Sequence, residues 1–228
     1  MAKRFLVVAA QQEELDGLFH DQKSVKKVAD FYVLENTDFV IYGIIGGIGK
    51  TAMAFRIGSF LQNIAVDEII NIGVAGSISK ELKPLEIMIA TKSAYHDVDL
   101  TPFGKPKGQM SDCPLYFECD KNGLDVARSF NIPEVKFGLI VSGDIFVTKD
   151  NLTTDLYENF DKPIACDMES AAVGQCAHIA DIPYMIIRAI SDDANSEANK
   201  NNYEKTLVDA SKEAGELAYK IIENLSRN

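Results

Sequence analysis

The sequence predicts an α/β protein of one domain, residues 1–228, in which a mixed central sheet carries helices on both faces. Short runs rich in β-branched residues alternate along the chain with longer segments that are compatible with helix. Strands that are separated by helices need crossover connections, which place helices against a largely parallel sheet. A chain of 228 residues fits one large domain, and no low-complexity tract or Pro/Gly/Ser linker divides it.

The first half of the chain is expected to begin with a strand and a helix. The apolar run 5–10 is the strand, and the acidic segment 11–19 that follows it is the helix. Further strands are predicted where β-branched and aromatic residues gather, and a further helix follows the glycines after residue 45. These strands span 31–34, 39–45, 68–72 and 87–94, and the helix spans 51–63.

The second half repeats the alternation of the first. Helices are expected at 122–130, 153–160, 169–180 and 203–224, and strands at 136–141, 163–166 and 184–190. Residues 96–114 lack a clear periodicity, and loops longer than about 12 residues in compact domains are usually functional or disordered. This segment is therefore a candidate for a site or an interface.

Charge and composition exclude several classes of protein. Thirty-four acidic and 23 basic side chains give a net charge of −11, which disfavours nucleic acid as a partner. No stretch free of Asp, Glu, Lys and Arg exceeds 11 residues, whereas a membrane-spanning helix needs about 20 apolar residues. The apolar run near the N-terminus is too short for a signal peptide, so the protein is expected in the cytoplasm. The four cysteines have no CxxC spacing and are expected to be reduced.

Ligands bind beyond the carboxyl ends of the strands in such sheets, and glycines or carboxylates follow nearly every expected strand. Each carboxylate taken alone fits a helix cap or a turn. Glu14, Glu169 and Asp192 nevertheless all follow strands at the edge where a pocket is expected. Such a group of carboxylates suits acid and base chemistry on an uncharged substrate.

Three local patterns suggest phosphate, dinucleotide or metal binding, but each matches its motif incompletely. Residues 44–51 nearly match the phosphate-binding GxxxxGK[ST] loop, but Ile44 stands where its first glycine is required. The GxGxxA pattern at 47–52 is typical of dinucleotide binding, but it lacks the acidic residue that should stand at the end of the next strand. The alternative to a nucleotide site is a tight strand-to-helix turn. Residues 96–99 carry metal-capable side chains, but neither His20 nor His178 completes a ligand pattern, and a structural cluster is expected there.

Seven motifs in order resemble the family of 5′-methylthioadenosine/S-adenosylhomocysteine nucleosidases, of the purine nucleoside phosphorylase/uridine phosphorylase superfamily. The resemblance covers almost the whole chain, although each motif alone is weakly specific. The motifs are Glu13-Glu14-Leu15, Gly47-Ile48-Gly49-Lys50, Asn71-Ile72-Gly73-Val74-Ala75-Gly76, Tyr95-His96-Asp97-Val98-Asp99, Val141-Ser142-Gly143-Asp144, Asp167-Met168-Glu169 and Arg188-Ala189-Ile190-Ser191-Asp192.

The resemblance implies cleavage of the N9–C1′ bond of a 5′-thio-substituted adenosine by water, a reaction of methionine salvage. It assigns Asp192 as the general acid that protonates N7 of the leaving adenine, and Glu14 as the general base that activates water, with Arg188 nearby. It assigns Glu169 to the ribose hydroxyls, where a carboxylate accepts two hydrogen bonds, and Met168 to packing against the ribose.

The resemblance also implies how the nucleoside is held. Phe146 is expected to stack on adenine, and the main chain of Val147 to bond to the edge of the base. Gly76 and Ala75 match a turn beside the base and sugar, where small side chains allow close approach. Ile48 matches an apolar contact to the 5′ group.

A homodimer without metal or cofactor is the implied assembly. Tyr203 matches an aromatic lid of the pocket, and Leu100 and Phe103 match a segment that reaches into the partner's pocket. A phosphate-dependent purine nucleoside phosphorylase is an alternative, but it needs cations where residues 11–14 are neutral or acidic. A non-catalytic adenosine-binding module is a second alternative, and it predicts loss of Glu14 or Asp192, both of which are present.

Overall fold

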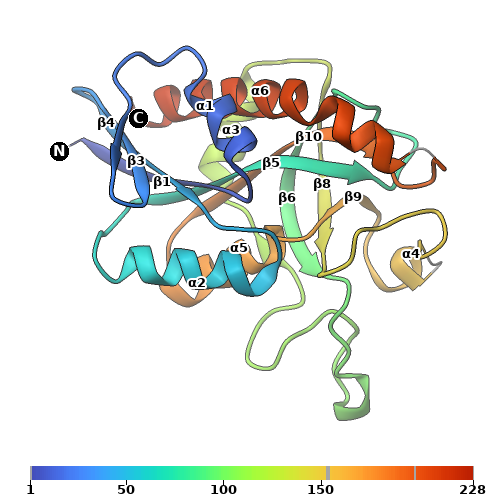
Figure 1. The fold of residues 1–228 in the computed structure, drawn as a ribbon. Helices are drawn as coiled ribbons and strands as arrows, with labels where there is room; N and C mark the ends of the chain where they lie inside the picture. The colour runs from blue at the N-terminus through green and yellow to red at the C-terminus, as the bar shows by residue number, and fades with distance from the viewer. Residues whose placement is uncertain (1, 153–154, 198, 228) are drawn as a thin grey trace.

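One mixed sheet forms the centre of the molecule, as Figure 1 shows for a computed structural model of the chain. The structure describes residues 2–152, 155–197 and 199–227. Within these residues the sheet has ten strands, with the order β10-β6-β8-β9-β5-β1-β4-β3-β2; β7 pairs with β6, and β10 also pairs with β5. The strands are β1 (Lys3–Ala9), β2 (Lys26–Val28), β3 (Phe31–Glu35), β4 (Phe39–Ile45), β5 (Glu68–Ser77), β6 (Ile87–Tyr95), β7 (Phe117–Glu118), β8 (Val135–Ser142), β9 (Pro163–Asp167) and β10 (Tyr184–Asp193).

Helices cover both faces of the sheet, so the predicted fold class is confirmed (Figure 1). The helices α1 (Gln12–Phe19), α3 (Lys121–Ser129) and α6 (Asn199–Leu225) lie on one face, and α6 contacts α1, β5 and β10. On the other face α2 (Lys50–Leu61) packs against α5 (Ser170–Ala180). The short helix α4 (Asp155–Asn159) begins at the third residue of the predicted helix 153–160, whose residues 153–154 lie outside the described chain.

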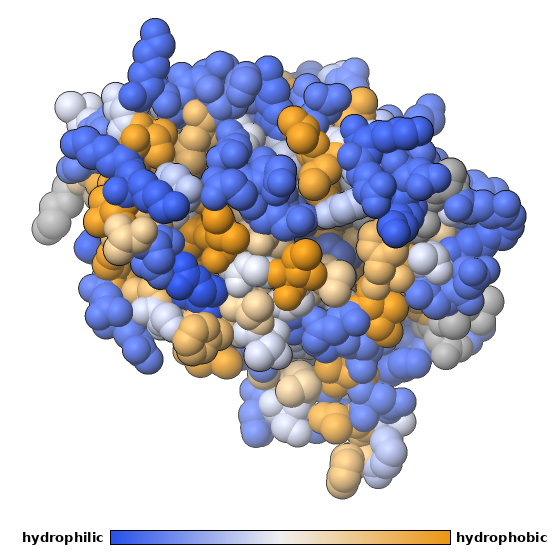
Figure 2. Space-filling view, in the orientation of Figure 1, coloured by the Kyte–Doolittle hydropathy of each residue, from blue (hydrophilic) through white to orange (hydrophobic). Residues whose placement is uncertain are grey.

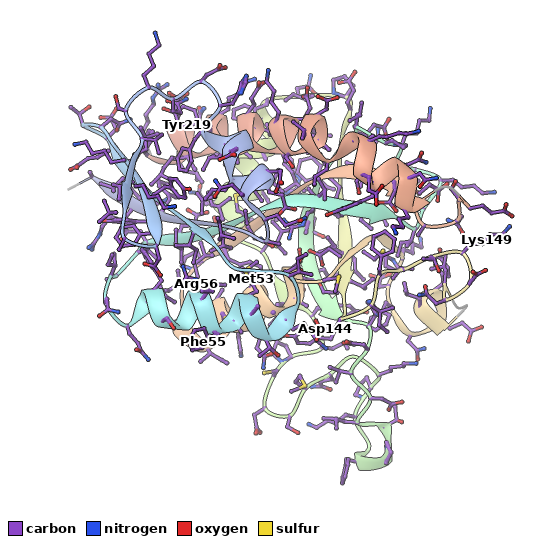
Figure 3. The ribbon with its side chains drawn as sticks, in the orientation of Figure 1. Met53, Phe55, Arg56, Asp144, Lys149 and Tyr219 are labelled. Carbon is purple, nitrogen blue, oxygen red and sulfur yellow. The ribbon has the colours of Figure 1, made fainter. Side chains whose placement is uncertain are left out.

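The central strands are buried because helices shield both of their faces. Phe5, Leu6, Val7 and Val8 of β1 are inaccessible to solvent, and β5 and β10 are almost as deeply buried. Continuous apolar runs of this kind are typical of parallel strands that are covered on both sides. Figure 3 shows how α2 shares in this core: Met53 points toward the sheet and is fully buried, whereas Phe55 points away from it and is 70% exposed.

Four parallel neighbours, β10, β5, β1 and β4, bring their carboxyl ends to one edge of the sheet. Ala9 at the end of β1 pairs with Ile45 at the end of β4, and Asp192 pairs with Gly76 of β5. A register shift between Ile190 and Asp192 interrupts the ladder of β10 and β5 at this point. Such a bulge turns a side chain away from the regular alternation of the strand.

The sequence prediction differs from the structure in the extent of several elements. Gly73–Gly76 and Ser191–Asp192 were expected just after strands but lie inside β5 and β10, because these strands continue to pair with each other through the bulge. The short strands β2 and β7 were missed, since three and two residues give no periodic pattern. None of the helices in the described residues is long and apolar enough to cross a bilayer.

The segment between β6 and β7 protrudes from the body, on the side of α2 and α5 (green in Figure 1). It holds the aperiodic residues 96–114, and the structure adds a 3₁₀ turn at Thr101–Phe103. The Phe103 side chain is 81% exposed. Figure 2 shows further apolar surface over the lower half of the same view, where α2 and this segment lie.

Candidate active site

A cavity of about 250 Å³ lies at the carboxyl edge of β10, β5, β1 and β4. Its lining comes from the ends of these strands, from the turns that follow β8 and β9, and from the first turns of α1 and α6. The lining residues are Ala10, Gln11, Glu14, Ile48, Val74, Ala75, Gly76, Ile145, Phe146, Val147, Cys166, Asp167, Met168, Glu169, Ser191, Asp192 and Tyr203. The set includes three carboxylates that are at least nine-tenths buried, Glu14, Glu169 and Asp192.

Glu14 is held by the main chain in the first turn of α1. Its Oε2 accepts hydrogen bonds from the N–H groups of Ala10 (2.8 Å) and Gln11 (3.0 Å), and its Oε1 accepts one from Val74 (3.0 Å). The bond from Gln11 is half of a capping box, which explains why an acid stands at this helical position. Burial raises the pKa of Glu14, and the charge of Arg188 and the three N–H groups lower it.

Gly73 gives Glu14 its space. Its φ of +152° lies outside the range that L side chains usually adopt, and a Cβ at this position would clash with Oε1 of Glu14. A glycine in β5 therefore lets the carboxylate approach the backbone of the strand closely.

Arg188 lies behind the cavity wall and is 2% exposed. It donates from Nε (3.1 Å) and Nη2 (2.8 Å) to Oδ2 of Asp167, from Nη2 (3.0 Å) to Oγ of Ser170, and from Nη2 to the amide oxygen of Asn71. The pairing with Asp167 compensates the burial of the guanidinium. The Nε and Nη2 donors of Arg188 are thus engaged by neighbours, and Arg188 acts on Glu14 through its charge.

Asp192 sits at the bulge of β10 with one carboxylate oxygen engaged. Its Oδ1 accepts a hydrogen bond of 2.5 Å from the hydroxyl of Ser191. Its Oδ2 faces Gly76, where an added Cβ would come within 3.3 Å. Burial raises the pKa of Asp192, with a smaller contribution from the charge of Asp193, while the Ser191 hydroxyl lowers it. A carboxyl group with a raised pKa is suited to hold a proton and donate it.

Glu169 is the N-cap residue of α5 and reaches across to the turn after β4. Its Oε1 accepts a hydrogen bond of 2.7 Å from the N–H of Gly49, a residue with φ of +92°. Burial, and then the charge of Asp167, raise the pKa of Glu169 to about 8. The glycine turn after β4 therefore serves a carboxylate of the protein, and it is the tight strand-to-helix turn that was the alternative to a phosphate loop.

Aromatic side chains close the mouth of the cavity. The rings of Phe146 and Tyr203 meet edge to face, with centroids 5.9 Å apart. Phe146 is 41% exposed and Val147 is buried. Gln11 donates from Nε2 to Oη of Tyr203 at 2.6 Å, which ties the start of α6 to the end of β1.

A polar cluster joins three turns beneath this site. Asp97 accepts at Oδ2 from Nζ of Lys50 (2.5 Å) and from the N–H of Asp144 (3.0 Å), and Asp144 accepts at Oδ1 from the N–H of Lys50 (2.8 Å). Asp144 lies near the first turn of α2 and the root of the protruding segment, as Figure 3 shows. Of the metal-capable residues 96–99, Asp97 belongs to this structural cluster, and Asp99 instead accepts from the N–H and hydroxyl of Thr101. Among the described residues, no group of three or more His, Cys, Asp and Glu side chains could hold a metal ion.

The structure brings most of the predicted site residues into one cavity. Ten line it: Glu14, Ile48, Ala75, Gly76, Phe146, Val147, Met168, Glu169, Asp192 and Tyr203. Arg188 stands behind the wall instead. Leu100 and Phe103 belong to the protruding segment and do not line the cavity of their own chain.

Sequence reasoning missed the roles of several polar residues near the site. Asn71 and Asp167 hold Arg188, Ser191 bonds to Asp192, and Gln11 bonds to Tyr203. A pairing of buried Arg188 with the acid of the 167–169 motif was available as a signal, because a buried guanidinium needs a carboxylate partner. The contact of Gln11 with Tyr203 spans 192 positions and left no local signal.

The sequence and the fold resemble those of known proteins. Residues 6–225 match the model of the phosphorylase superfamily. A curated 5′-methylthioadenosine/S-adenosylhomocysteine nucleosidase of Buchnera aphidicola is 35% identical over 89% of this chain and 88% of the relative.

Solved structures are also similar. A putative nucleosidase of this kind from Borrelia burgdorferi, bound to adenine, is 30% identical with a TM-score of 0.88, covering 96% of this chain and 99% of that one. The Neisseria meningitidis enzyme in complex with methylthio-immucillin-A is 31% identical with a TM-score of 0.89, covering 97% and 99%. The chain therefore belongs to the phosphorylase superfamily and, within it, to the family of 5′-methylthioadenosine/S-adenosylhomocysteine nucleosidases.

Proposed function

We propose that the chain hydrolyses the N-glycosidic bond of 5′-methylthioadenosine and S-adenosylhomocysteine, releasing adenine and the 5′-thioribose. One observation carries the proposal: Glu14 and Asp192 lie in the same cavity, both buried, while no Lys or Arg is among its described lining residues. A base for water and an acid for the leaving group are what this hydrolysis needs. The names of the relatives and the adenine and inhibitor complexes of the solved structures support the same substrates.

Each carboxylate has a distinct task in this reaction. Asp192 transfers its proton to N7, so that the electron pair of the N9–C1′ bond leaves with a neutral adenine. Glu14 accepts a proton from water, whose oxygen bonds to C1′ of the sugar. Glu169 accepts hydrogen bonds from the ribose hydroxyls, and the positive charge that develops on the sugar favours its ionised form, which in turn stabilises that charge. Its bond from Gly49 fixes Oε1, so the geometry is set before substrate arrives.

A phosphorylase reaction is the nearest alternative, and the electrostatics of the cavity disfavour it. Phosphate needs cationic side chains or free N–H donors, but Arg188 is buried against Asp167, Ser170 and Asn71. Three main-chain N–H groups near the cavity already serve Glu14. Buried carboxylates would repel a phosphate dianion, whereas water carries no charge.

The test is a product analysis with and without phosphate. Purified protein is incubated with methylthioadenosine or S-adenosylhomocysteine, and the products are separated by liquid chromatography. We expect adenine and the free thioribose at a rate that phosphate does not change. A phosphorylated ribose would show that the reaction is phosphorolysis, and release of no adenine from either nucleoside would overturn the proposed activity.

We infer further that two copies of the chain form a homodimer and that the protruding segment of each supplies Leu100 and Phe103 to the other's pocket. The 81% exposure of Phe103 and the 70% exposure of Phe55 on α2 support this, since large apolar side chains on one side are typical of an interface. Light scattering would measure the assembly. A cytoplasmic location for this single nucleosidase domain is part of the same proposal, and cell fractionation would test it.

A further inference from the structure

The order of the strands sets the order of contacts along the cavity. Asp192 on β10, Gly76 on β5, Gln11 after β1 and Ile48 after β4 follow one another across the sheet edge. Neighbouring strands lie about 4.8 Å apart, so roughly 10 Å separates the end of β10 from that of β1. If the proposed function holds, a nucleoside whose base lies at Asp192 directs its 5′ substituent toward the ends of β1 and β4.

Two polar side chains occupy that end of the cavity. Gln11 and Tyr203 both line it and both are half-buried, and Nε2 of Gln11 donates to Oη of Tyr203 at 2.6 Å. The main chain of Gln11 is fixed by its N–H bond to Glu14, and the Tyr203 ring is fixed against Phe146. The pair is therefore held in place before a ligand binds.

The pair keeps hydrogen-bonding capacity for a ligand. Nε2 of Gln11 donates to Tyr203, and the Gln11 side chain also accepts from the N–H of Glu14 as the other half of the capping box. An amide oxygen has two lone pairs, so Oε1 of Gln11 can still accept a hydrogen bond from a ligand. Oη of Tyr203 accepts the bond from Nε2 and keeps its own proton to donate. Burial raises the pKa of Tyr203, so the phenol stays neutral near pH 7. An acceptor and a donor therefore stand side by side.

Such a pair matches a hydroxyl group, which donates and accepts, better than a thioether, whose sulfur is only a weak acceptor. We propose that Gln11 and Tyr203 determine specificity at the 5′ position, and that the chain therefore also hydrolyses adenosine-type nucleosides with a 5′-hydroxyl group. A ligand that displaces water from these half-buried groups without bonding to them loses the binding energy of that hydrogen bond. Ile48 provides the apolar contact that retains methylthioadenosine as a substrate.

The experiment compares adenosine with methylthioadenosine in the wild-type protein, Gln11→Met and Tyr203→Phe, with kcat/KM measured from adenine release. We expect adenine from both nucleosides with the wild type. In each variant the ratio of kcat/KM for adenosine to that for methylthioadenosine should fall about 2- to 10-fold, the range for one neutral hydrogen bond. The double variant should fall little further than the stronger single one, because both residues act through one contact.

The chain offers a matched control in a second Gln–Tyr pair. Tyr32 donates from Oη to Oε1 of Gln12 at 3.0 Å, and neither residue lines the cavity. Gln12→Met and Tyr32→Phe make the same chemical changes next to the site and should leave the ratio unchanged. Tyr203→Phe removes a single oxygen atom and tests the inference even if Gln11→Met fails to fold.

The outcomes separate this inference from the proposed function. Release of no adenine from either nucleoside by the wild type overturns both. Hydrolysis of methylthioadenosine without hydrolysis of adenosine overturns only the inference. A ratio within twofold of the wild type in both single variants does the same, as does an equal fall in the control variants.

Discussion

At the scale of single residues, the site consists of three buried carboxylates whose partners differ. Glu14 is held by main-chain N–H groups, Glu169 by one N–H of the next turn, and Asp192 by a neighbouring hydroxyl. Burial raises the pKa of all three, and Oδ2 of Asp192 faces Gly76. These partners, more than the residue type, distinguish the three carboxylates in their proposed roles as acid, base and ribose ligand.

Asp192→Asn should abolish most turnover and spare binding. Asparagine keeps the size of the side chain and can donate an amide hydrogen bond to N7. Its N–H protons are not acidic, so it cannot transfer one to the leaving base. We expect kcat for methylthioadenosine to fall at least 10²- to 10⁴-fold, while adenine still binds by calorimetry. Near-normal kcat in a folded variant would contradict the general-acid role. Activation of the leaving group would then be sought in residues 142–147.

Glu14→Gln and Glu169→Gln should differ in which kinetic constant they change. Glu14→Gln removes the base for water and should lower kcat with little change in substrate affinity. Glu169→Gln replaces a carboxyl oxygen that accepts from the ribose hydroxyls, and that can ionise as the sugar becomes positive, with an amide NH₂ group, and it should lower both affinity and kcat. Steady-state kinetics with calorimetric affinities for a non-hydrolysable analogue separate the two. Identical effects of the two substitutions would refute the separate roles.

At the scale of elements, turns that are far apart in the chain meet beneath the cavity. The turn before α2 carries Gly49, whose N–H orients Glu169, and the same turn is held through Lys50 by Asp97 and Asp144. Asp144 also precedes Phe146 and Val147, which line the cavity. Despite its burial, the pKa of Asp97 is lowered, because Lys50 and the N–H of Asp144 stabilise its charge. This cluster thus links the turn that orients Glu169 to the turn that carries Phe146 and Val147.

Asp97→Ala should therefore loosen the site as well as the fold. The substitution leaves Lys50 and the N–H of Asp144 without their acceptor, which should lower the free energy of unfolding by about 1 to 3 kcal/mol. KM for methylthioadenosine should rise, because Gly49 and Phe146 lose a common support. Asp30→Ala is the matched control: Asp30 is 64% exposed and pairs at 2.6 Å with Arg56 of the same helix α2. Its loss should cost less than about 1 kcal/mol and leave KM unchanged, and equal effects of the two variants in chemical denaturation and kinetics would contradict the link.

At the scale of the whole molecule, the protruding segment concerns the assembly of two copies, and the buried acids concern the pH dependence of stability. The segment carries exposed Phe103 away from the cavity of its own chain, which fits a contribution to a second copy. The buried acids have raised pKa values in the folded chain, so they bind protons more tightly there than in the unfolded chain. The free energy of unfolding therefore depends on pH.

Phe103→Ala should weaken methylthioadenosine binding more than adenine binding. Full burial of a large apolar side chain contributes roughly 1.5 to 3 kcal/mol, and the proposed contact is with the 5′ group, which free adenine lacks. Calorimetry with the two ligands measures the difference. Equal losses for both ligands, or a fully active monomer in light scattering, would refute the proposed arrangement.

Stability should fall as pH rises from about 5 to 8. The pKa of Glu169 is about 8 in the folded chain against an ordinary value of 4.5, so across this window the folded state keeps a proton that the unfolded state releases. Below pH 4.5 both states are protonated and the difference vanishes. Glu169→Gln does not titrate, so its melting temperature should decline less across the same window. Parallel melting curves for the two proteins over this pH series would contradict the raised pKa.

The sequence by itself determined the α/β class and most of the elements, because period-2 and period-3.6 patterns are local signals. Its seven motifs, through their resemblance to a known family, also pointed to ten of the residues that line the cavity. The structure added what depends on long-range pairing. Asp192 faces Gly76 only because β10 and β5 pair through a bulge, Arg188 is neutralised only where Asp167 meets it, and Gln11 contacts Tyr203 across 192 positions. Strand ends were misplaced for the same reason: a strand continues as long as its neighbour offers hydrogen bonds, and no local pattern records where the neighbour ends.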